Sequence, residues 1–264
     1  MRKILYFISL LSIFSVFCVL TQTAFASSSS SSGKSGTSDK FIVQPNGEQS
    51  VGYPQISIRT NAKANPIDFN KFAATCDSIA DSYPVNDPSD RSQAVKKYLL
   101  EQIGSGDLGH VWIIVFNSAR PGDYVSYSYW KGSGYVSNHN KNYSGYDPSE
   151  REFLYQKDIK LPQNMNTTKI ENELIPPLLK QSTNIGKILG IPEDITGNGT
   201  FTPVTTCSWF CGNLWNSINK LDNQVDFTSP FSNSSEHAKK WGMPFLADLN
   251  SFANPGALAK YLSK

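Results

Sequence analysis

Two neighbouring segments with strong β-strand character place the tightest constraint on the fold. Residues 108–117 (LGHVWIIVFN) form a dense apolar run of strand length, and residues 123–130 (DYVSYSYW) are rich in Tyr, Val and Trp. The stretch between them, NSARPG, supplies the Pro and Gly residues of a turn. The sequence therefore predicts that the two segments pair as an antiparallel β-hairpin.

The rest of the chain mixes strand and helix patterns, which favours an α+β fold. Alternating residues predict one or two strands within 41–60, and EREFLYQKDIKLP at 150–162 predicts another. Residues 131–150, rich in Gly, Ser, Asn and Tyr, are expected to form a loop. Helical spacing predicts helices at 67–82, 90–103, 168–189 (broken at Pro176 and Pro177) and from 207, with two short helices within 235–264.

The first 26 residues have the pattern of a secretory signal peptide. Two basic residues near the start precede an apolar run from Ile4 to Leu20, and Ala24 and Ala26 supply small residues where a signal peptidase reads. No stop-transfer charge follows, which argues against a membrane span. We therefore expect residues 1–26 to be removed and the mature protein to be secreted or periplasmic.

The mature chain is expected to be one domain without net charge. Residues 27–40 (SSSSSSGKSGTSDK) predict a flexible leader, and 41–264 predict a single domain with additions at both ends. The chain has 24 Lys and Arg against 22 Asp and Glu, and the predicted signal carries two of the basic residues and no acidic one. A neutral chain has no electrostatic reason to bind nucleic acid or anionic lipid, so we expect neither nucleic acid nor stable membrane insertion.

Export makes the three remaining cysteines informative, because an oxidising compartment tends to pair thiols and an odd number leaves one over. Cys207 and Cys211, four residues apart on a helix, do not readily meet disulfide geometry. A bond from Cys211 to Cys76 and a set of buried, reduced thiols both stay open. Zinc needs three or four ligands, and no histidine lies in a ligand-spaced pair, so we expect no metal and no other cofactor.

Cys207 is a candidate nucleophile. Thr205 and Thr206, both natural N-cap residues, stand directly before it, which predicts that Cys207 lies in the first turn of a helix. The unpaired N–H groups and the dipole of that turn stabilise a thiolate. The broad apolar face of this helix can hold its N-terminus in place; it comprises Trp209, Phe210, Leu214, Trp215 and Ile218.

A cysteine nucleophile needs a base, and His110 is the strongest candidate. It directly precedes the apolar run VWIIVF and follows Gly109, so it stands at the lip of a predicted core strand. His139, in the polar stretch SNHNKN, is expected to be solvated. His237, in SSEHAKK, is expected to be exposed at a helix start.

With these residues in hand, the chain resembles a circularly permuted member of the NlpC-type cell-wall peptidase superfamily. This is the papain-like group that also includes relatives of lecithin–retinol acyltransferase. CSWFC at 207–211 fits the opening of the family's nucleophile helix, and GHVWIIV at 109–115 fits its histidine strand. The histidine here precedes the cysteine, which is the permuted order. The resemblance covers roughly residues 104–220.

The resemblance implies a papain-like fold, in which an antiparallel sheet packs on the helix that bears the nucleophile. It implies that Cys207 attacks a carbonyl, that His110 moves the proton, and that a third polar group on the next strand orients the imidazole. If the two hairpin strands pair, His110 faces Trp130, and Ser128 is the best third group on that sheet face; a backbone carbonyl is the alternative. Trp130 and Trp209 are expected to line a substrate groove.

The function expected from these features is an exported papain-like cysteine peptidase or amidase that cleaves amide bonds in peptidoglycan stem peptides. An acyltransferase or thioesterase using the same pair of residues is an alternative. A non-catalytic secreted binding module is another, in which Cys207 is bonded to Cys76 or Cys211. The partners that fit are a peptidoglycan or peptide substrate and, for an antibacterial effector, an inhibitor or immunity protein.

Overall fold

The computed structural model describes residues 40–84, 87–103, 108–139, 145–192 and 196–264. These ranges belong to one unit of the chain. The predicted signal peptide (1–26) and the predicted leader, apart from Lys40, lie outside the described residues and stay predictions.

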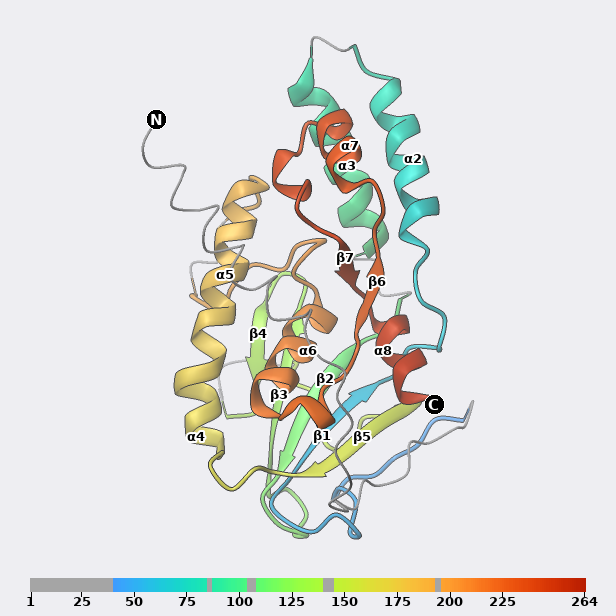
Figure 1. Cartoon of the computed structure of the whole chain (residues 1–264). Coiled ribbons are helices and arrows are strands. Elements are labelled where there is room, and N and C mark those ends of the chain that lie inside the picture. Colours follow the sequence, from blue (N-terminus) through green and yellow to red (C-terminus); the bar gives the residue numbers. More distant parts are fainter. Residues whose placement is uncertain (1–39, 85–86, 104–107, 140–144, 193–195) are drawn as a thin grey trace. The chain divides into compact units, whose positions relative to one another are not determined.

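A five-stranded sheet forms the centre of the described fold (Figure 1). Its order is β4-β3-β2-β1-β5, and every neighbouring pair is antiparallel. The strands are β1 (Gln55–Thr60), β2 (Val111–Phe116), β3 (Tyr124–Trp130), β4 (Gly134–Ser137) and β5 (Tyr155–Lys160). The α+β class is therefore as expected, and so is the hairpin of β2 and β3.

One strand prediction needs correction. β4 lies inside the segment 131–150, which we expected to be a loop, because Gly, Ser and Asn around it mask a four-residue strand. Of the one or two strands expected within 41–60, β1 is present, and Ile42 makes an isolated bridge to Phe153.

Every side chain of β2 is buried, because both faces of the sheet are covered. On one face, alternate residues of β1, β2 and β3 join the main apolar cluster together with α6 (Cys207–Ile218) and α8 (Pro255–Leu262). Trp112, Ile114 and Phe116 point to the opposite face, where Phe153 packs on them. A strand buried on both sides shows no polar alternation, which explains the continuous apolar run in the sequence.

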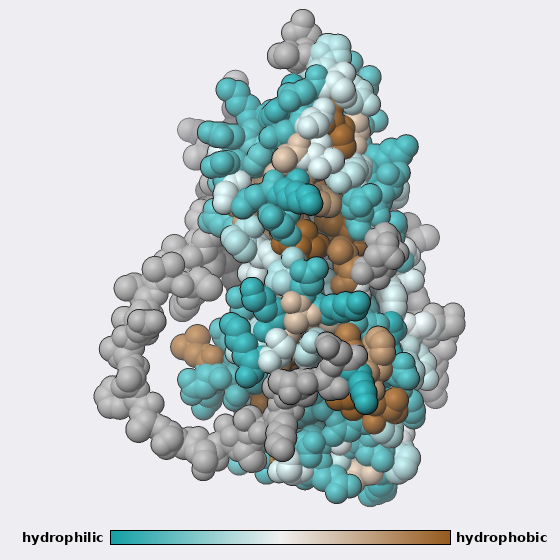
Figure 2. All heavy atoms as spheres, turned by 90° about the vertical axis from the view of Figure 1, so that its right-hand side faces the viewer, coloured by the Kyte–Doolittle hydropathy of each residue, from teal (hydrophilic) through white to brown (hydrophobic). Residues whose placement is uncertain are grey.

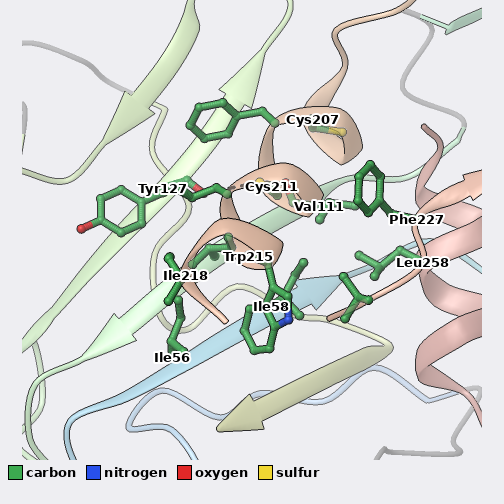
Figure 3. Packing of buried hydrophobic residues seen from close by; sticks show 14 of the residues in the cluster. Ile56, Ile58, Val111, Tyr127, Cys207, Cys211, Trp215, Ile218, Phe227 and Leu258 are labelled. Atoms are coloured by element: carbon green, nitrogen blue, oxygen red, sulfur yellow. Dashed lines mark hydrogen bonds between the residues drawn. The ribbon is translucent and has the colours of Figure 1, made fainter. Parts of the chain in front are cut away.

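Helix α6 lies on the main face of the sheet, against β2 and β3 (Figure 1). Phe210, Leu214 and Trp215 are fully buried there. Figure 3 shows Cys207, Cys211 and Trp215 on successive turns of this helix, above the strands. The predicted apolar face therefore fixes the N-terminus of α6 over the sheet.

The helix expected at 168–189 is not broken at its two prolines. It runs through α4 (Thr167–Lys169), a π-helical segment (Ile170–Leu174) and α5 (Ile175–Ile188). Pro176 and Pro177 lack an N–H group and their rings crowd the preceding turn of a regular α-helix. The widened π turn lies directly before them, so the chain accommodates both prolines without ending the helix.

A second apolar cluster lies among α2 (Phe69–Asp81), α3 (Pro88–Ile103) and α7 (Ser234–Trp241). Two short strands, β6 (Thr228–Pro230) before α7 and β7 (Ser251–Ala253) before α8, pair as an antiparallel sheet. The remaining short elements are 3-10 turns at Leu221–Asn223 and Pro244–Leu246. On the face shown in Figure 2, hydrophilic residues cover most of the surface and apolar residues form smaller patches between them. None of the helices in the described ranges is both long enough and apolar enough to cross a membrane.

Candidate active site

The site lies at the end of the β2–β3 pair where the pairing between the two strands stops. Its first pair is Ile113 with Tyr127, so Val111 lies beyond the paired residues of these two strands. The two thiols of α6 lie against the backbone of Val111 instead. The carbonyl of Val111 accepts a hydrogen bond from the Cys211 thiol at 3.4 Å, and its N–H lies near enough to Cys207 to lower the pKa of that thiol. The first turn of α6 therefore packs against the end of β2 that β3 leaves unpaired.

Cys207 is the first residue of α6, as expected, and Thr206 is its N-cap. The Thr206 hydroxyl accepts a hydrogen bond from the Trp209 N–H at 3.4 Å, which satisfies one of the unpaired donors of the first turn. Thr205 fixes the loop before the helix, because its hydroxyl donates to the Thr200 carbonyl at 2.9 Å. The cysteine is only 7% exposed, because α6 packs against the sheet.

His110 reaches Cys207 from the start of β2. Gly109 before it has a φ of 82°, and a Cβ there would lie 2.6 Å from the Ala62 Cα, so only glycine fits. The His110 N–H donates to Asn61 Oδ1 at 2.7 Å, which holds the backbone of the histidine. The imidazole lies close enough to the Cys207 thiol for each group to shift the pKa of the other. The structure therefore brings the two leading sequence candidates together.

A third residue, Asp147, completes the site. Its Oδ2 lies 2.8 Å from His110 Nε2, which leaves Nδ1 as the ring nitrogen for the thiol. Ser128, our sequence candidate for this role, donates its hydroxyl to the same Oδ2. It thus supports the carboxylate that contacts the imidazole. Arg151 Nη1 donates to the other oxygen, Oδ1.

The sequence analysis did not identify Asp147, because it lies in the polar segment 131–150. The composition of that segment predicts a loop, and no periodic pattern in it indicates which residues contact the sheet. The available signal was an acidic residue four positions before Arg151, followed by Pro148. The structure shows what fixes it. Arg59, fully buried on β1, donates to the carbonyl of Ser149 at 3.0 Å and so holds the chain two residues after Asp147 against the sheet.

The contacts favour a thiolate–imidazolium pair. Burial opposes charge on Cys207, but the hydrogen bond and positive charge of His110, with the Val111 N–H, bring the pKa of Cys207 below its ordinary value. Burial likewise disfavours the imidazolium, yet the charge and hydrogen bond of Asp147 raise the pKa of His110 to about 9. Asp147 stays ionised although it is buried, because His110 and then Arg151 and Ser128 hold its pKa low.

Two tryptophans frame the imidazole. The Trp130 ring stacks on His110 with ring centres 4.0 Å apart, and the Trp112 ring lies 5.7 Å away, inclined by 13°. Trp130, expected to line a substrate groove, thus packs on the catalytic candidate itself. Trp209, given the same role, is half-buried in the first turn of α6 and packs against the main apolar cluster.

The other histidines lie in separate pairs. His139 pairs with Glu171 at 2.9 Å, and its side chain is 52% exposed, in line with the expected solvation. His237 contacts Asp77 at 3.0 Å and its side chain is only 16% exposed, because it stacks on Trp241. The expectation of an exposed His237 was therefore wrong.

All three cysteines of the described ranges are free and buried, so Cys76 and Cys211 form no disulfide. Burial raises the pKa of Cys76 to about 12 and also raises that of Cys211. Of these three thiols, Cys207 alone has a lowered pKa. No group of three or more His, Cys, Asp or Glu side chains suited to a metal ion gathers within the described part of the chain.

No protein-family model, no curated protein and no solved structure matches this chain.

Proposed function

We propose that the chain is an exported cysteine hydrolase of permuted papain-like architecture that cleaves amide bonds in the stem peptides of peptidoglycan. One observation carries the proposal: His110 contacts Asp147 and lies beside Cys207 in a buried site whose interactions lower the pKa of the thiol and raise that of the imidazole. A nucleophile, a base and an acid that orients the base are the parts that acyl transfer needs. The two short motifs at 109–115 and 207–211 support the family.

In the acylation step the Cys207 thiolate attacks the carbonyl carbon of the scissile amide. The carbonyl oxygen takes the negative charge, and the first turn of α6 offers the N–H groups of Cys207 and Ser208, which the Thr206 cap does not use. The His110 imidazolium then gives its proton to the leaving amine. The C–N bond breaks, and an acyl thioester and a neutral imidazole remain.

In the deacylation step His110 takes a proton from water, and the resulting hydroxide attacks the thioester. The C–S bond breaks, which releases the carboxylic acid and restores the thiolate and the imidazolium. Asp147 stabilises the charged imidazole in both steps and keeps its ring orientation. A serine at that position orients a ring but carries no compensating charge, so the carboxylate supports a stronger base than our sequence candidate Ser128 would.

An acyltransferase or a thioesterase would pass through the same acyl thioester as the proposed hydrolase. The acyltransferase differs from the hydrolase in the group that accepts the acyl chain, and the thioesterase differs in the bond from which the acyl group is taken. The binding module was motivated by a disulfide at Cys207, and the free thiol removes that motive. The small exposed fractions of Cys207 (7%) and His110 (6%) mean that a substrate chain has to displace part of the cover before its carbonyl reaches the sulfur.

The test combines labelling and turnover. Iodoacetamide at pH 6 should add one label, at Cys207, and purified stem peptides should yield new amino groups with the wild-type protein but not with Cys207→Ala. Because Cys207 is buried, this variant is expected to lose about 1 kcal/mol of stability, and its unfolding curve serves as the check of folding. Labelling of Cys211 before Cys207, or equal turnover by Cys207→Ala, would refute the assignment.

A further inference from the structure

Arg151 is the most exposed of the side chains that contact Asp147. Its side chain is 28% exposed, against 8% for His110 and none for Asp147. Ser128 is fully buried as well. A ligand that approaches this network from solvent therefore meets a cation first.

The guanidinium lies over two aromatic rings. Its carbon lies 5.1 Å from the Trp112 ring and 5.2 Å from the Trp130 ring. The same two rings stack on the His110 imidazole. The cation and the imidazole thus share one aromatic frame, and little conformational entropy remains to be lost when a ligand binds.

The donors of this cation are only partly used. A guanidinium carries five N–H groups. Arg151 gives one of its nitrogens to Asp147, and among the described residues its side chain makes no other hydrogen bond. The buried indole N–H of Trp130 also lacks a partner within those ranges. Unused donors beside the imidazole are suited to an anionic acceptor.

We propose that Arg151 binds a carboxylate of the substrate, close to the scissile amide. This inference rests on the proposed function and names its substrate class: peptides that carry a free carboxylate within a residue or two of the bond that is cut. A planar guanidinium matches a planar carboxylate with two parallel hydrogen bonds, which an uncharged carboxamide cannot reproduce. Stem peptides with free carboxyl groups meet this requirement.

The simpler role for Arg151 is to hold Asp147 in place. The two roles predict different effects of substitution on one ratio, that of the affinities for peptides with and without a carboxylate. A residue that only positions Asp147 affects peptides with and without a carboxylate equally, because it acts through His110. A residue that binds the substrate carboxylate affects the preference between the two peptides.

The experiment uses the full chain with Cys207→Ala, which binds without turnover. Stem peptides isolated from cell wall are compared with the same peptides after conversion of their carboxylates to carboxamides. The free acids should bind about 10- to 100-fold more tightly. Adding Arg151→Gln should reduce this ratio to about one, and Arg151→Lys should leave an intermediate ratio. Arg120→Gln, which removes an exposed cation in the turn after β2, should leave it unchanged.

Equal binding of acids and carboxamides, or a preference that persists in Arg151→Gln, would overturn the inference. If Arg151→Gln does not fold, Arg151→Lys decides it by the same ratio. Turnover is scored separately on the protein that retains Cys207. A preference for acids without hydrolysis would reject the hydrolase while the carboxylate site stands. Hydrolysis without the preference would do the opposite.

Discussion

The carboxylate of Asp147 lies 2.8 Å from Nε2 of His110, although 37 positions separate the two residues. This contact adds a third group to the cysteine–histidine pair: an ionised carboxylate that stabilises a positive charge on the imidazole. It also accounts for the raised pKa of His110, since burial alone would lower it. The role of Asp147 can be separated from that of its neighbours by substitution.

Asp147→Asn should reduce turnover by roughly 10³- to 10⁴-fold, because an amide offers neither the charge nor the correct acceptor pattern for an imidazolium. It should also lower the pKa of His110 and raise that of Cys207. The measurement is the pH dependence of Cys207 alkylation together with turnover. Ser128→Ala removes only one donor to the carboxylate and should cost far less. If the two variants lose equal activity, Asp147 does not have this role.

A second prediction concerns pH. The reactive state pairs a thiolate with an imidazolium, so it exists above the lowered pKa of Cys207 and below the raised pKa of His110, about 9. Turnover should therefore fall as pH rises through about 9, when His110 no longer holds a proton for the leaving amine.

His110→Ala should move the alkylation of Cys207 to higher pH, since burial then acts on the thiol without a cation beside it. His237→Ala is the control, because His237 pairs with Asp77 in the other apolar cluster. An unchanged alkylation profile in His110→Ala would contradict the ion pair.

How far the sequence predicts this molecule depends on the range of the interactions involved. The hairpin and the capped start of α6 follow from local patterns, and both are present. His110 and Cys207 were singled out one by one, by a strand lip and a helix cap, and the fold brings them together. Asp147 depends on a tertiary contact from Arg59 to the chain around Ser149, which no local pattern encodes. The burial of Cys207 likewise results from packing of distant segments.

The sheet face opposite α6 yields a prediction on stability. Asp158 is buried on β5, and burial raises its pKa to about 6, partly offset by the Ser57 hydroxyl and the Arg59 charge. Its unfolded value is about 3.9. The folded state therefore binds more protons between pH 4 and pH 6, so its stability falls as pH rises through that window.

Asp158→Asn should abolish this loss and keep an acceptor for Ser57. The free energy of unfolding of the variant, relative to wild type, should rise by up to about 3 kcal/mol between pH 4 and pH 6. Denaturant unfolding at several pH values measures it. Asp222→Asn, in an exposed 3-10 turn, controls for the loss of one charge. A difference that does not change with pH would show that Asp158 is not the group responsible.

The last prediction tests how Gly109 positions His110. Gly109 and Gly122 have nearly equal φ angles, 82° and 79°, so alanine at either position costs about 1–2 kcal/mol of backbone strain. Only at Gly109 does the new Cβ also meet the backbone of Ala62, at 2.6 Å, whereas nothing lies within 4 Å at Gly122. To relieve that clash the chain must move next to His110, and a shift near 1 Å is enough to cost on the order of 10²-fold in rate. Gly109→Ala should therefore slow both turnover and Cys207 alkylation at pH 6, while Gly122→Ala loses similar backbone stability and keeps both rates. Equal rates in the two variants, at matched stability, would show that the approach of Gly109 to Ala62 does not set the position of the histidine.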